Sequence, residues 1–163
     1  MPKVIHIDLS VNYSIDAAIK ELDNTVAEIR RRTQQLVERL TEEGAQIARV
    51  QVMSLGAVYT GELLNSIEGF YDSESHVGII RAGAYYAAYV EYGTGIIGQG
   101  SPHPDPDGWV YDVNGHGEKG WVYYNSNDDQ FHWTAGMSAR PFMHNAANEL
   151  RSVCSRIARE VFA

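Results

Sequence analysis

The sequence has a single cysteine, Cys154, among its 163 residues. A chain with one cysteine cannot form an intramolecular disulfide, which excludes a disulfide-stabilised scaffold and favours folding in a reducing compartment. The sequence also lacks the run of about 20 apolar residues that a transmembrane helix needs. Its first residues, Met1–Asp8, hold no apolar run long enough for a signal peptide. These absences predict a soluble protein that is made in the cytoplasm.

Basic residues are scarce, with 13 Lys and Arg against 21 Asp and Glu, a net charge of −8. The segment Gly61–Ala139 holds 11 acidic residues and only two basic ones, Arg81 and Lys119, so its own net charge is −9. A protein that coats DNA or RNA needs dense positive charge to displace counterions, so this charge balance argues against a general coating role. The acidic segment is either an ordinary solvated face or a distinct surface that meets a basic partner or repels polyanions.

Apolar residues recur at helical spacing from Asp16 to about Glu43, which predicts a long amphipathic helix. Two series with a seven-residue period form this pattern, interrupted only by Thr33: Ile15, Leu22, Ile29 and Leu36, and Ile19, Val26 and Leu40. Ser14 is a plausible N-cap. The period suits packing on a sheet and a coiled-coil partner equally well. Residues 45–55 either extend this helix or begin a strand.

The rest of the chain predicts short elements and a closing helix. Thr60 can cap a short helix that buries Leu63, Leu64 and Ile67, and residues 66–71 and 76–82 read as two strands around an acidic turn. Residues 85–92 suit a strand by composition and a helical turn by the spacing of their tyrosines. Residues 109–111 and 121–124 predict a hairpin around Asn114-Gly115, with 131–133 as a possible third strand. The last helix follows Arg140, with Pro141 in its first turn.

These elements predict a single α+β domain over residues 1–163. A long N-terminal amphipathic helix and a C-terminal helix pack on an antiparallel β-sheet. Residues 95–138 form an inserted aromatic β-hairpin or loop.

The sequence offers no convincing active site, so we expect no catalytic residue, no cofactor and no bound metal. His103, Asp105 and Asp107 lie close together, either as metal ligands or as a polar loop, but paired cysteines and an HExxH helix are absent. Glu91 lies among aromatic residues, either as a general acid or as a structural hydrogen-bond acceptor or partner contact. Cys154 is interpreted as a small core residue.

Three segments, in order, resemble a known pattern. They are Thr60–Ile67 (TGELLNSI), Tyr86–Thr94 (YAAYVEYGT) and Arg140–Ala146 (RPFMHNA). Together with the long helix before them and the terminal helix after them, they are similar to the tail-component family of long-tailed bacteriophages, which completes tails and joins heads to tails. TG-x-L-x-x-SI, YA-x-YVE-[FY]-GT and PF-x-x-x-A segments recur in that order in the family, and the resemblance covers about Ile15 to Ala163.

The resemblance implies a non-enzymatic virion protein of the neck or upper tail, made in the host cytoplasm, that joins tail to head. It implies a ring-forming homo-oligomer, with a hexamer expected, and partners among the head-closure protein, the tail terminator and the tail tube. Double-stranded DNA would pass without specific binding, and no membrane is involved. A tail terminator or a head-closure protein of the same region is the nearest alternative. A metal- or carboxylate-dependent hydrolase using His103, Asp105, Asp107 or Glu91 is the alternative from a different class.

The motif residues divide into two expected roles. Glu91 and Tyr92 are assigned to contacts, and Trp109 and Trp121 of the insertion either anchor a subunit or partner contact or pack on the parent sheet. The remaining motif residues are assigned mainly to the fold: Gly61, Leu63, Ser66, Tyr89, Gly93, Pro141 and Phe142.

Overall fold

The long amphipathic helix is present and is longer than the sequence predicts. The computed structural model describes residues 12–112, 115 and 119–163, so the prediction for Met1–Asp8 and the turn residue Asn114 lie outside the described residues. Helix α1 spans Asn12–Ser54, 43 residues. Ser14 therefore lies inside the helix and is not its N-cap. Residues 45–54 extend the helix, because its buried side chains Ala45, Ala48 and Val52 keep the helical spacing.

The central hairpin agrees with the predicted strands. Helix α2 (Glu62–Asn65) leads into β1 (Ile67–Asp72), which pairs antiparallel with β2 (Val77–Ala82). In the acidic turn, the backbone N–H of Glu74 donates to Asp72 Oδ1 at 2.9 Å. Short polar side chains that satisfy backbone groups in this way favour tight turns.

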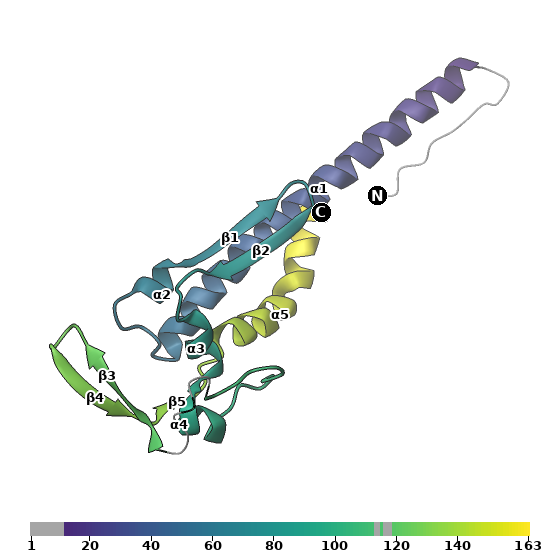
Figure 1. Ribbon diagram of the computed structural model, residues 1–163. Helices are drawn as coiled ribbons and strands as arrows, with labels where there is room; N and C mark the ends of the chain where they lie inside the picture. The colour runs from purple at the N-terminus through teal and green to yellow at the C-terminus, as the bar shows by residue number, and fades with distance from the viewer. Residues whose placement is uncertain (1–11, 113–114, 116–118) are drawn as a thin grey trace.

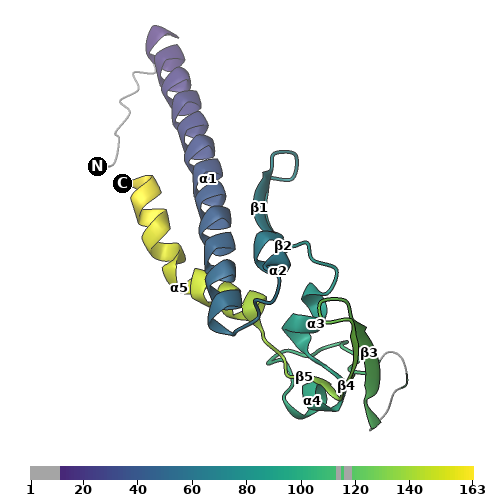
Figure 2. The same cartoon turned by 90° about the vertical axis from the view of Figure 1, so that its left-hand side faces the viewer.

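Helix α1 lies between this sheet and the last helix, α5 (Phe142–Phe162), as Figure 2 shows. Glycines let the sheet approach α1 closely, since a Cβ built on Gly78 would lie 2.0 Å from Thr41 Oγ1. The core forms where α1, α2, β1 and α5 meet, and its fully buried large side chains are Val52, Leu63, Ile67 and Phe142. The predicted long helix, antiparallel sheet and closing helix are therefore confirmed as an α+β fold.

Between residues 85 and 138 the structure differs in part from its predicted form. Residues 85–92 end in a short helix, α3 (Ala87–Tyr92), and a second short helix, α4 (Gly95–Gly100), follows where a loop was expected. Residues 109–111 form no strand, so the predicted pairing with 121–124 is wrong. Instead, β3 (Trp121–Asn125) pairs antiparallel with β4 (Gln130–Thr134), and β5 (Gly136–Met137) leads back toward α5.

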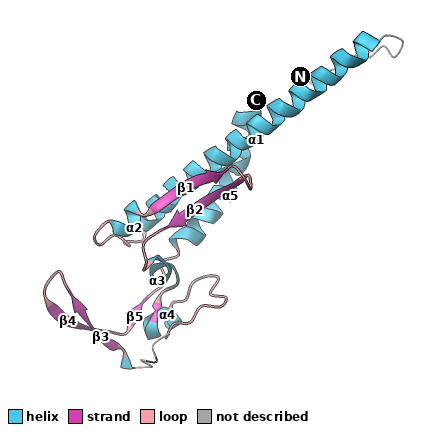
Figure 3. Ribbon diagram, turned by 45° about the horizontal axis from the view of Figure 1, so that its top comes forward, coloured by secondary structure: helices cyan, strands magenta, loops and turns pink. Residues whose placement is uncertain are grey.

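The molecule is elongated. The β3–β4 hairpin lies at one end, and the N-terminal part of α1 projects from the other (Figures 1 and 3). Among the described residues, no helix is both long enough and apolar enough to cross a membrane.

Candidate interaction surfaces

Glu91 is a buried carboxylate at the junction of α3, α5 and the loop that follows α4. Its side-chain oxygens accept backbone N–H bonds from Met143 at 2.8 Å and from His144 at 2.9 Å. These are N–H groups of the first turn of α5, which have no partner inside their own helix. Pro141, which precedes α5 as its N-cap rather than standing inside the first turn, has no side-chain acceptor to offer them. Glu91 therefore caps α5 from α3, and its negative charge also suits a helix N-terminus.

His103 completes this buried polar cluster. Its Nε2 lies 3.1 Å from Glu91 Oε1, and the two residues are only 4% and 6% exposed. His103 Nδ1 lies 2.7 Å from the Asp105 carbonyl oxygen and 2.9 Å from the Asp105 nitrogen, so both ring nitrogens have partners within this cluster. The structure thus brings together two residues of the hydrolase alternative. Within the described residues, however, no group of three or more His, Cys, Asp or Glu is placed to hold a metal ion.

Trp109 packs on the motif around Glu91. Its ring stacks on Tyr92 with centroids 4.9 Å apart and lies edge-on to Tyr89 at 5.7 Å. Its indole Nε1–H donates to the Gly93 carbonyl at 3.0 Å. Gly93 has a φ of 80°, and a Cβ there would lie 2.7 Å from the Ala139 nitrogen. Of the two roles open to Trp109, this geometry supports packing inside the subunit.

The other motif residues sit at turns or in the core. Gly61 precedes α2 with a φ of 82°, and the Thr60 hydroxyl accepts the Glu62 N–H at 3.3 Å. Leu63 and Phe142 are each 1% exposed. Ser66 ends α2 and donates from Oγ to the Leu63 carbonyl at 2.8 Å.

One face of the β3–β4 hairpin is apolar and exposed. Its register places Val122 opposite Trp133 and Tyr124 opposite Phe131, and side chains two residues apart share a face. We call these four residues the hairpin face. Trp121 lies on the opposite face and is half-buried. The sequence analysis therefore did not identify the exposed aromatic residues. Side chains alternate between the two faces of a strand, so the patterns of 121–124 and 131–133 could have indicated which residues share a face.

A second apolar surface lies on the projecting part of α1. Ile19, Leu22, Val26 and Ile29 belong to the predicted stripe but are exposed. We call these four residues the helix stripe. The C-terminal end of α5 reaches α1 about one turn after Ile29. There Arg32 Nη1 donates a hydrogen bond to the carbonyl of Ala163, just after α5, at 3.1 Å.

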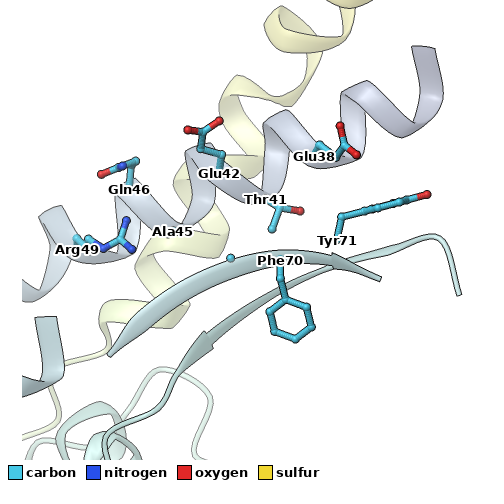
Figure 4. Close-up of a pocket in the computed structure, with 9 residues that line it drawn as sticks. Glu38, Thr41, Glu42, Ala45, Gln46, Arg49, Phe70 and Tyr71 are labelled. Carbon is cyan, nitrogen blue, oxygen red and sulfur yellow. The ribbon is translucent and has the colours of Figure 1, made fainter. Parts of the chain in front are cut away.

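A polar groove runs between α1 and the outer edge of β1 (Figure 4). It has a volume of about 450 Å³. Glu38, Glu42, Gln46 and Arg49 line its helix side, whereas Phe70 points away from it on the outer face of the sheet. In the described part of the chain β1 pairs only with β2, so this edge can accept a further strand.

Ion pairs stiffen α1 and join it to α5. Hydrogen bonds from Arg31, and then from Arg32, lower the pKa of Glu28 to about 2. Arg39 Nη2 lies 2.7 Å from Glu160 Oε2, and hydrogen bonds from Arg39 and Arg156 hold the pKa of Glu160 below its ordinary value. The second pair links two helices that are distant in sequence.

Comparison with known families bears on the first two motifs. Residues 19–93 match the model of a family described as "Bacteriophage HK97-gp10, putative tail-component". A search of curated proteins and a search of solved structures find no match. The matched segment includes most of α1, the β1–β2 hairpin and α3, whereas the third motif, Arg140–Ala146, lies beyond it. Over residues 19–93 the chain is thus similar to the HK97-gp10 family of phage tail components, which confirms the family resemblance.

Proposed function

We propose that this chain is a structural subunit of the head–tail connection of a long-tailed phage, where copies form a ring that completes the tail. The observation that carries the proposal is the match of residues 19–93 to a tail-component family. That segment contributes most of the buried core, so the similarity concerns the body of the fold.

Two features of the structure support self-association through heterologous contacts. The long helix presents an exposed apolar stripe, and the edge of β1 lies beside a polar groove. Heterologous contacts that close on themselves generate rings. The cluster around Glu91 then serves the fold, because its carboxylate holds the first turn of α5.

The test is to delete the chain from the phage that encodes it and to image the particles. Filled heads beside finished but unattached tails are the expected result for a tail-completion protein. Tails of uncontrolled length would instead assign it as a tail terminator, and heads that lose their DNA would assign it as a head-closure protein. Normal infectious particles, with the chain absent from purified wild-type virions, would contradict the proposal.

A further inference from the structure

We propose that copies of this chain associate end to end, so that the hairpin face of one copy covers the helix stripe of the next. The biological role of this contact rests on the proposed function. The hairpin face and the helix stripe are the two surfaces through which neighbouring copies would meet.

The helix stripe needs a partner that this copy does not supply. Its four side chains are between 46% and 53% exposed, although their spacing is that of a packing face. Ile29 borders two hollows of about 380 and 290 Å³, one toward the β1–β2 turn and one toward Phe162. Contiguous apolar surface of this kind marks a protein contact more often than a solvated face.

The hairpin face has the same property at the other end of the molecule. Its four side chains are between 52% and 76% exposed. Its two cross-strand pairs lie side by side and make one apolar patch, while the opposite face carries the stacked rings of Tyr123 and His132, 5.7 Å apart. A two-stranded sheet is at best marginally stable by itself, so a contact that covers one face would also stabilise the hairpin.

The position of the two surfaces favours a second copy as the occupant. They lie at opposite ends of the elongated chain in both views (Figures 1 and 2), so one copy cannot cover its own stripe. A coiled coil of two α1 helices would cover the stripes and leave both hairpin faces exposed. A contact between the stripe of one copy and the hairpin face of the next covers both surfaces, and it repeats from copy to copy.

Arg30, beside the helix stripe, and the acidic turn of the hairpin carry opposite charges. Arg30 follows Ile29 directly, is exposed, and forms no ion pair within the described residues. The turn of the hairpin carries Asp128 and Asp129, both exposed. Opposite charges at the rim of an apolar contact fix its orientation more than its strength.

The experiment uses two full-length variants that each lose one surface. The stripe variant carries Leu22→Glu and Val26→Glu, and the hairpin variant carries Val122→Glu and Phe131→Glu. Native mass spectrometry should find oligomers of the wild-type chain and loss of oligomers in each variant alone. A mixture of the two variants should form a heterodimer and nothing larger, because one intact contact is restored between an unaltered stripe and an unaltered hairpin.

Matched controls carry the same new charge at similar exposure elsewhere. Met53→Glu lies on α1 away from the stripe, and Val110→Glu lies in the inserted region away from the hairpin. Both should oligomerise like the wild-type chain. If the hairpin variant still dimerises by itself while the stripe variant does not, the helices pair with each other and the proposal is wrong.

A disulfide test avoids reliance on the charged variants should they fold poorly. In a Cys154→Ser background, Val26→Cys and Phe131→Cys proteins are mixed and oxidised. A mixed disulfide should form far faster than with a Val110→Cys protein in place of Phe131→Cys. If it does not, the contact is overturned. If virions contain the chain but its copies do not make this contact, the inference is wrong and the proposed function stands. If copies make the contact but the chain is absent from virions, the proposed function is wrong and the contact stands.

Discussion

Glu91 shows how one side chain can hold two parts of the chain together. It is buried, it comes from α3, and its oxygens accept N–H groups from Met143 and His144. Glu91→Gln keeps the shape but replaces one acceptor oxygen by an amide donor that faces another N–H. Because a buried unsatisfied group costs about 1–3 kcal/mol, we expect the free energy of unfolding to fall by that amount in urea denaturation.

The control for this prediction is Glu62→Gln, an equally conservative change at an exposed position of α2. It should leave the unfolding midpoint nearly unchanged. Equal stabilities for the Glu91 variant and the wild-type chain would show that the cap contributes nothing.

The ion pair between Arg39 and Glu160 gives a pH-dependent prediction. Folding lowers the pKa of Glu160, chiefly through the hydrogen bond from Arg39. A carboxyl group with a lowered pKa stabilises the fold above its unfolded pKa, and this contribution is lost as the pH falls through the folded pKa. In Arg39→Ala we expect the pKa of Glu160 to rise toward its ordinary value, as measured by NMR titration of the carboxyl carbon.

Arg31→Ala is the matched control, since Arg31 pairs with Glu28 on the same helix. It should raise the pKa of Glu28 from about 2 and leave Glu160 unmoved. A Glu160 pKa that is the same with and without Arg39 would refute the assignment.

At the scale of elements, the sequence alone predicted the helices and strands that are specified by residues close together in the chain. Helix α1, the β1–β2 hairpin and α5 follow from hydrophobic periodicity and turn residues. The insertion was mispredicted because Trp109–Tyr111 has a β-prone composition but is held by a non-local contact, the stacking of Trp109 on Tyr92. Tertiary contacts of this kind override local propensity.

The interaction surfaces were predictable only in part, for a related reason. For Trp109 and Trp121 the sequence left open a contact or packing within the subunit. Both are half-buried, whereas Phe131 and Trp133 are exposed. Which face of a hairpin meets solvent depends on the register, and the register here follows from the turn at 126–129. The role of Glu91 as an acceptor was one of two open alternatives, because its donors lie about 50 residues away.

The packing of the β1–β2 sheet on α1 gives a prediction for one glycine. A Cβ at position 78 would lie 2.0 Å from Thr41 Oγ1 and 3.0 Å from Val37 Cγ1. Gly78→Ala must therefore push the sheet away from the helix, and overpacking of this kind costs about 1–3 kcal/mol. We expect a lower melting temperature by calorimetry. Gly100→Ala, where nothing lies within 4 Å of the new Cβ, should melt at or slightly above the wild-type temperature.

At the scale of the whole molecule, several carboxylates of the acidic segment Gly61–Ala139 lie at three tips. Glu74 lies in the β1–β2 turn, Asp105 and Asp107 lie in the loop after α4, and Asp128 and Asp129 lie in the β3–β4 turn. All of these residues are exposed. In a ring of identical copies, only tips that point inward meet the central channel. Under the proposed function, the acidic charge would therefore affect DNA passage only through tips that point inward.

This gives a prediction about DNA release under the proposed function. Phage carrying Glu74→Lys or Asp107→Lys would each present one new ring of positive charge at a tip outside the proposed contact between copies. If a tip lines the channel, its Lys ring attracts the phosphate backbone, so DNA ejection should slow, and the slowing should weaken as salt is raised. We expect this for at least one tip and wild-type rates for tips on the outside, measured by dye fluorescence during triggered ejection. Wild-type rates in both phages, with normal assembly, would mean that these tips face solvent or a protein partner and not the DNA.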